Sequence, residues 1–125
     1  MHFSKHYTLE QARALLPVVR KNLEELDACR QRLISLDERV GAMASNGADV
    51  GGEAVNQLVG TIARFQQILR QFRDRQIQIK DLDRGLVDFP SLREGREVFL
   101  CWEKEEDDIE FWHDLESGYA GRERL

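Results

Sequence analysis

The segment KDLDRGLVDFP, residues 80–90, separates two parts of the chain that differ in hydrophobic periodicity. Before it, apolar residues recur three and four positions apart, which is typical of amphipathic helices. After it, apolar residues recur two positions apart, which is typical of β-strands. The segment itself carries three aspartates and an arginine, so it must lie in water or have its charges paired. The sequence therefore predicts an α+β fold with the helices first and a sheet second.

The composition limits the classes of protein and partner. A length of 125 residues with 42% hydrophobic and 33% charged residues predicts a single globular domain over residues 1–125. The net charge of −5 argues against general nucleic-acid binding and against an anionic membrane surface. No apolar run is long enough for a membrane helix, and the N-terminus lacks the apolar core of a signal peptide. With only two dispersed cysteines, we expect a cytoplasmic protein.

The first helix is predicted over residues 8–44, and a sequence motif locates its N-terminus. Thr8 and Gln11 have the spacing of a capping box, in which each side chain accepts a hydrogen bond from the other residue's backbone N–H. Pro17 lies inside the pattern, and because proline lacks a backbone donor it predicts a kink or a break. Ser45, Asn46 and Gly47 open a glycine-rich connector and end the helix.

A second long helix is predicted over residues 53–79. Its apolar residues follow the three- and four-residue steps of a coiled-coil seam. We expect the two helices to form a long antiparallel hairpin, with a surplus apolar face that packs against the C-terminal sheet, a second subunit, or both. The seam consists of Val55, Leu58, Ile62, Phe65, Leu69 and Phe72.

The region 80–125 predicts an acidic junction followed by a small sheet and a tail. Alternation indicates strands over 86–89, 96–102 and 109–113, which together form a three-stranded antiparallel meander packed with the hairpin. Pro90 is expected to end the first of these strands, because it cannot donate to a ladder. The strand over 96–102 is apolar on both faces, which predicts a central position.

Four stretches resemble a bacterial family known as domain of unknown function 2203. Three lie in the C-terminal region: KDLDRGLVDFP at 80–90, GREVFLCW at 95–102 and FWHDLESGYAGR at 111–122. The fourth, YTLEQARALLP at 7–17, resembles the opening of that family. The resemblance implies a small bacterial cytoplasmic protein. It supplies no catalytic residues, because no activity is established for the family.

Polar residues near the predicted sheet form the candidate site. Oxygen and imidazole donors can hold a divalent metal, and the candidate ligands are Asp81, Asp83, His113 and Glu116. The alternative is that His113 caps the last strand and the aspartates pair with nearby arginines. The tail from Glu116 to Arg122 could likewise form an anion-binding nest or pack back on the sheet. The full cluster is Asp81, Asp83, Arg84, Asp88, Arg96, His113, Glu116, Tyr119 and Arg122.

These observations favour a non-enzymatic interaction module that self-associates, as a dimer, through the helical seam. A protein partner is compatible with the same surface, whereas nucleic acid and membrane are not expected. The alternative function is a divalent-metal-binding protein or metal-dependent enzyme that uses the Asp, His and Glu residues of the C-terminal region. Cys101 is expected to be a buried thiol rather than a nucleophile.

Overall fold

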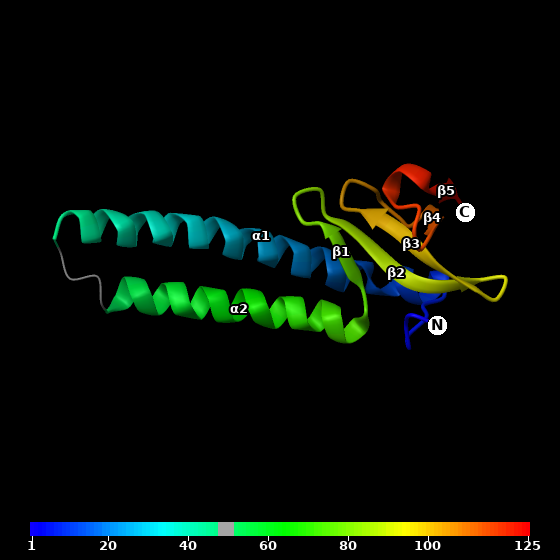
Figure 1. Ribbon diagram of the computed structural model, residues 1–125, viewed down its shortest axis with the longest axis horizontal. Coiled ribbons are helices and arrows are strands. Elements are labelled where there is room, and N and C mark those ends of the chain that lie inside the picture. The colour runs from blue at the N-terminus through cyan, green and yellow to red at the C-terminus, as the bar shows by residue number, and fades with distance from the viewer. Residues whose placement is uncertain (48–51) are drawn as a thin grey trace. The chain divides into compact units, whose positions relative to one another are not determined.

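The computed structural model describes residues 1–47 and 52–125 and confirms the α+β class (Figure 1). The chain divides into two compact units, one formed by residues 1–23 and 71–125 and the other by residues 24–70. No helix in the described ranges is both long and apolar enough to cross a membrane. The elements are α1 (Leu9–Ser45), α2 (Glu53–Arg75), β1 (Gln78–Asp81), β2 (Leu86–Arg93), β3 (Arg96–Glu103), β4 (Phe111–Asp114), the 3-10 helix η1 (Tyr119–Gly121) and β5 (Glu123–Arg124).

Helix α1 begins with the predicted capping box. The Gln11 backbone N–H donates to Thr8 Oγ1 at 3.1 Å, and the Thr8 N–H donates to Gln11 Oε1 at 2.9 Å. The helix then continues without a break through Pro17 to Ser45, so the predicted alternative of two separate helices is wrong. Side chains on both sides of the proline, including Ala12 and Val19, are buried, and this packing holds the two segments in one helix. A kink at Pro17 stays a prediction.

Helix α2 ends at Arg75 rather than at the predicted residue 79. Gln76 adopts a left-handed conformation, with φ of 59°. The Ile77 N–H donates to the Phe72 carbonyl at 3.1 Å, and the Gln76 N–H donates to the Arg73 carbonyl at 3.0 Å. These two bonds form a Schellman motif. The sequence did not indicate this end, because glutamine is not a usual residue at the left-handed position.

Tertiary contacts stabilise that unusual position. The Gln76 Oε1 accepts hydrogen bonds from the backbone N–H groups of Ser4 and Lys5, each at 3.0 Å. The Gln76 Nε2 donates to Ser4 Oγ at 2.8 Å. The N-terminal segment thereby holds Gln76, the residue after α2, in place through three hydrogen bonds. Strand β1 begins three residues after the helix ends.

The sheet has five antiparallel strands in the order β1-β2-β3-β4-β5, so the prediction of three strands is wrong. The extra strands are the two edges: β1 pairs Gln78 with Asp88, and β5 pairs Arg124 with Phe111. Both are too short to show alternation in the sequence. The last strand also starts later than predicted. Strand β4 begins at Phe111, and Ile109, the first residue of the predicted strand, is a fully buried residue before it. The predicted central position of β3 is confirmed.

Strand β2 continues through Pro90 to Arg93, contrary to the expectation that the proline ends it. The Pro90 carbonyl accepts a hydrogen bond from the Tyr7 N–H at 2.7 Å and therefore points away from β3. In an antiparallel strand the backbone N and C=O of one residue point to the same side, so the ring nitrogen of Pro90 also points away from β3. The pairing with β1 ends earlier, at Asp88, so no ladder bond requires a donor at Pro90.

The two faces of the sheet differ in character. One face is apolar and lies against the first turns of α1, where the Arg20 guanidinium lies 4.9 Å from the centroid of the Trp102 ring. The other face carries polar side chains from β2, β3 and β4 between apolar ones. The buried residues of the apolar face are Val87, Phe89, Val98, Leu100, Trp102 and Trp112.

The second unit consists of the helical residues 24–45 and 53–70 with the connector between them. Residues 48–51 of the predicted connector lie outside the described residues. An ion pair joins Arg64 of α2 to Glu25 of α1. The buried side chains of this unit are Leu26, Cys29, Leu36, Ala54, Thr61 and Ile68.

Part of the buried stripe of α2 is displaced by one residue from the predicted seam, whereas Phe72 of that seam is buried as predicted. Ile62 and Leu69 of that seam are exposed, whereas the preceding residues Thr61 and Ile68 are buried. Thr61 can be buried because its hydroxyl donates to the Gln57 carbonyl of its own helix at 2.7 Å. Periodicity alone did not distinguish the two stripes, because both are largely apolar.

Candidate functional site

Three buried polar side chains meet on the polar face of the sheet: Asp88 from β2, Cys101 from β3 and His113 from β4. We call them the polar core cluster. The strand register places Asp88 opposite Cys101, and His113 opposite Phe99. One carboxylate oxygen, the sulfur and one ring nitrogen lie within 4.8 Å of one another. The alternation of the strands puts all three on one face, but only the register brings them together.

His113 is bonded through both ring nitrogens. Its Nε2 lies 3.0 Å from Asp88 Oδ2, and its Nδ1 lies 2.7 Å from the Asp114 backbone carbonyl. Because a carbonyl only accepts, Nδ1 carries a hydrogen. Burial lowers the pKa of His113, but its hydrogen bonds to Asp88, Cys101 and the Asp114 carbonyl outweigh burial and raise the pKa to about 10. His113 and Asp88 therefore form a buried imidazolium–carboxylate pair.

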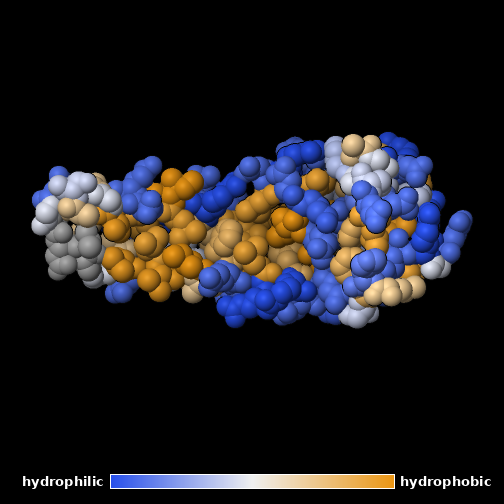
Figure 2. Space-filling view, in the orientation of Figure 1, coloured by the Kyte–Doolittle hydropathy of each residue, from blue (hydrophilic) through white to orange (hydrophobic). Residues whose placement is uncertain are grey.

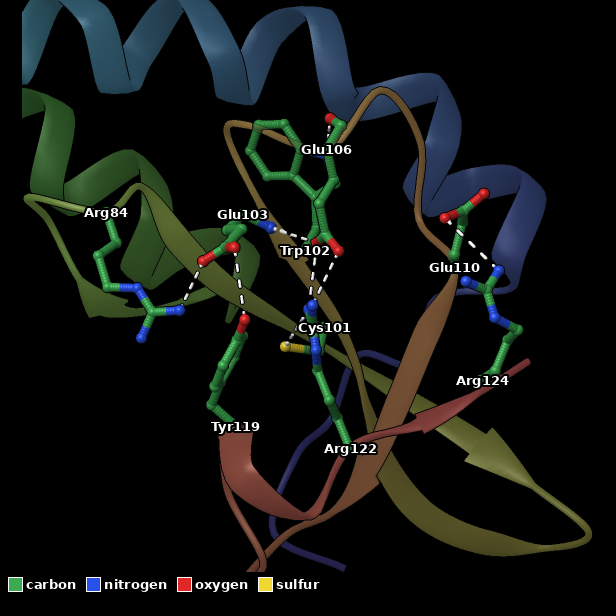
Figure 3. Close-up of polar contacts among 9 residues, drawn as sticks. All are labelled: Arg84, Cys101, Trp102, Glu103, Glu106, Glu110, Tyr119, Arg122 and Arg124. Atoms are coloured by element: carbon green, nitrogen blue, oxygen red, sulfur yellow. Dashed lines mark hydrogen bonds and ion pairs between the residues drawn. The ribbon is translucent and has the colours of Figure 1, made fainter.

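Arg122 closes the cluster from the C-terminal tail (Figure 3). Its Nη1 and Nη2 donate to the two carboxylate oxygens of Glu106, at 3.1 and 2.9 Å. The same Nη1 lies 3.8 Å from Cys101 Sγ. Glu106 also accepts from the Glu103 N–H at 2.9 Å, so the β3–β4 turn holds the carboxylate that orients the arginine.

Tyr119 anchors the tail beside this arginine. Its ring lies 4.3 Å from the Arg122 guanidinium on one side and 4.2 Å from that of Arg84 on the other. Arg84 donates to Glu103 at 2.8 Å, and the Tyr119 hydroxyl lies 3.4 Å from the same carboxylate (Figure 3). Gly121 permits a close approach within the tail, because a Cβ there would lie 2.7 Å from Ser117 Cβ.

The remaining predicted residues lie elsewhere. Asp81 accepts a hydrogen bond from the Arg84 N–H at 3.2 Å in the β1–β2 turn, and Arg96 pairs with Asp114 at 3.4 Å. Asp83 and Glu116 are exposed. Within the described ranges, the three side chains close enough together to hold a metal ion are those of the polar core cluster. The predicted ligands Asp81, Asp83 and Glu116 are not among them.

A second polar centre, at Glu97, was not predicted. Glu97 accepts hydrogen bonds from the backbone N–H groups of His2 and Phe3, at 2.7 and 3.0 Å, and lies 2.8 Å from His6 Nε2. Burial raises the pKa of Glu97, but the bonds from His6, His2 and Phe3 outweigh it and hold the pKa at about 2. The Phe3 ring packs edge-on against Phe99 at 5.4 Å. No sequence signal connects residues this far apart.

We expect Glu97→Gln to destabilise the fold at neutral pH, and the deficit to shrink in acid. The pKa of Glu97 is about 2 in the folded state against an ordinary 4.5, so the carboxylate contributes stability above about 4.5 that is lost as pH falls through about 2. Urea unfolding of both proteins between pH 7 and pH 2 measures the difference. Glu116→Gln, at an exposed carboxylate, is the matched control. A deficit that does not change with pH would contradict the assignment.

A groove of about 730 Å³ lies next to Glu97 on the same face of the sheet. Its lining includes the Phe3 and Phe99 rings together with Lys80, Asp114 and Glu116. Because these charges have both signs, the groove has no single electrostatic preference and indicates no ligand class.

The comparisons with known proteins identify a family and no activity. A family model described as "Uncharacterized conserved protein (DUF2203)" matches residues 5–125. No curated protein and no solved structure matches the chain significantly.

Proposed function

The chain belongs to this uncharacterised conserved family, and from that premise we propose that it is a non-enzymatic interaction module that forms a symmetric dimer. The proposal includes an antiparallel, coiled-coil-like helical hairpin, kinked at Pro17, and a place in the bacterial cytoplasm. The interface is the outer face of α2.

The observation that supports this proposal is an apolar stripe beside the buried stripe of α2. Val59, Ile62 and Leu69 lie on one side of the helix at steps of three and seven residues, and their exposed fractions are 60%, 40% and 39%. Figure 2 shows hydrophobic residues gathered over the helices on the face it displays. An apolar stripe along an exposed helix is typical of a helix that packs against a partner.

A second copy of the chain fits this stripe by symmetry. In a twofold interface the same patch occurs on both subunits, so apolar side chains of two α2 helices would meet one another. Burying what remains exposed of Val59, Ile62 and Leu69 on both copies contributes about 1 kcal/mol per side chain. This gross gain of about 6 kcal/mol for the two copies is offset by the loss of translational and rotational freedom on association, so the expected dimer is weak.

We expect the full chain to sediment as a dimer at high protein concentration and to dissociate on dilution, because self-association follows mass action. Leu69→Glu should give a monomer at all concentrations, because a carboxylate in an apolar interface is costly. Val18→Glu is the matched control: Val18 has the same exposed fraction of 39% on α1 but lies outside the α2 stripe. Circular dichroism checks that both variants stay helical.

Two results would contradict the proposed dimer. One is a monomeric mass for the unaltered chain over the whole concentration range. The other is a dimer that survives Leu69→Glu, which would move the interface away from α2.

A further inference from the structure

We propose that Asp88, Cys101 and His113 form a buried binding site for a divalent transition metal of the zinc class. The inference rests on the convergence of one carboxylate, one thiol and one imidazole from three neighbouring strands. It is independent of the proposed dimer, because these residues and the α2 stripe belong to different units of the chain.

The donor types select the metal. A mixed set of sulfur, nitrogen and oxygen suits Zn²⁺, whereas Mg²⁺ and Ca²⁺ prefer oxygen alone. With bond lengths of about 2.0–2.3 Å, donors around a tetrahedral Zn²⁺ lie about 3.3–3.8 Å apart. In the polar core cluster, His113 Nε2 and Asp88 Oδ2 are 3.0 Å apart and the three donor atoms lie within 4.8 Å of one another. These separations differ from the tetrahedral spacing by no more than about 1 Å.

The orientation of His113 is that of a metal ligand. Its Nδ1–H donates to the Asp114 backbone carbonyl at 2.7 Å, and this bond directs Nε2 toward Asp88. A metal-bound histidine commonly donates its second N–H to a carbonyl or carboxylate, which fixes both the tautomer and the ring orientation. On binding, the metal takes the place of the Nε2 proton, and Nδ1 keeps its partner.

Asp88 supplies a second, independent observation. Its side chain is 2% exposed, and Oδ1 has no hydrogen-bond partner among the described residues. A buried carboxylate oxygen without a partner is costly. In the proposed site both oxygens of Asp88 contact the metal, so Oδ1 acquires a partner and the metal has four donor atoms without water, in a distorted rather than a regular tetrahedral arrangement.

The charges balance in the proposed site. A divalent cation with one thiolate and one carboxylate is neutral, which suits a buried position. Arg122 does not oppose this, because its guanidinium is paired with Glu106 through two hydrogen bonds. Its Nη1 lies 3.8 Å from Cys101 Sγ and donates to the thiolate from outside the coordination sphere. Binding releases the thiol proton and the Nε2 proton to solvent.

The test uses the full chain without an affinity tag. The protein is unfolded with reductant and chelator and then refolded with increasing Co²⁺, because buried ligands become accessible only in the open chain. We expect a near-ultraviolet sulfur-to-cobalt charge-transfer band that saturates at one Co²⁺ per chain and disappears when Zn²⁺ displaces it. Cys101→Ser should abolish this band, and Asp88→Asn and His113→Gln should each weaken binding at least about a hundredfold.

Two substitutions control for the donor type. Cys29→Ser removes the other buried thiol, and His6→Gln removes a histidine that contacts Glu97 instead. Both should leave the charge-transfer band and its stoichiometry unchanged. A band that survives Cys101→Ser, or that Cys29→Ser removes, would overturn the assignment.

X-ray absorption of the zinc-loaded, unaltered chain decides the question even if a variant fails to fold. The proposal requires one sulfur neighbour at about 2.3 Å and nitrogen or oxygen neighbours at about 2.0–2.2 Å. A zinc environment without sulfur, or no binding that saturates at one equivalent, would refute it.

Discussion

Replacing Trp102 with alanine is expected to lower the free energy of unfolding by about 3–5 kcal/mol. Trp102 is fully buried in the central strand β3. Its Nε1–H donates to the Glu106 carbonyl at 2.9 Å, which ties the β3–β4 turn to the apolar face. Alanine would leave a large cavity and remove this bond. Because folded proteins are stable by about 5–15 kcal/mol, this loss is a large fraction of the total stability.

Urea unfolding followed by circular dichroism measures the loss, with two controls. Trp102→Phe keeps most of the ring but lacks the donor, so it should cost less than alanine. Leu92→Ala, at an exposed position of the neighbouring strand β2, should cost less than about 1 kcal/mol. Equal losses for Trp102→Ala and Leu92→Ala would contradict the account of the core.

Replacing Asp88 with alanine is expected to cost about 3–5 kcal/mol in metal-free protein, because it breaks a buried pair. His113 must then either lose its Nε2 proton or stay charged without a counter-ion. Both side chains are 2% exposed and their charged atoms are 3.0 Å apart. Asp114→Ala removes a half-exposed carboxylate that pairs with Arg96 at 3.4 Å. That control should cost less than about 1 kcal/mol.

A double-mutant cycle separates the pair from the rest of the cluster. If Asp88 and His113 stabilise each other, the loss for Asp88→Ala with His113→Ala is smaller than the sum of the two single losses. Chelator is present throughout, so that metal binding does not contribute. Additive losses would show that the two side chains act independently.

Part of the architecture could be predicted from short-range patterns. The capping box at Thr8 needs only residues three positions apart, and the apolar alternation around Trp102 needs only neighbours in one strand. The α+β class, the start of α1 and the central strand could therefore be derived from the sequence. The edges of the sheet could not, because β1 and β5 have four and two residues and owe their conformation to pairing with a neighbour.

The candidate site, like the fold, could be predicted only in part from the sequence. Asp88 and His113 could be identified as candidates because they are polar residues in apolar strands. Their contact, and the addition of Cys101, depend on the β2–β3 and β3–β4 registers, which local sequence does not encode. The Glu97 centre depends on contacts with residues more than 90 positions away.

The sequence by itself determined the order of helices and strands and which strand is buried on both faces, because periodicity and capping act over a few residues. Only the tertiary structure decided where α2 ends, how β2 passes through Pro90 and which stripe of α2 is buried. The first two depend on long-range partners, Ser4 for Gln76 and Tyr7 for Pro90, and the third is a matter of which side chains are buried. Such partners satisfy hydrogen bonds or exclude water at positions where local preference alone is ambiguous.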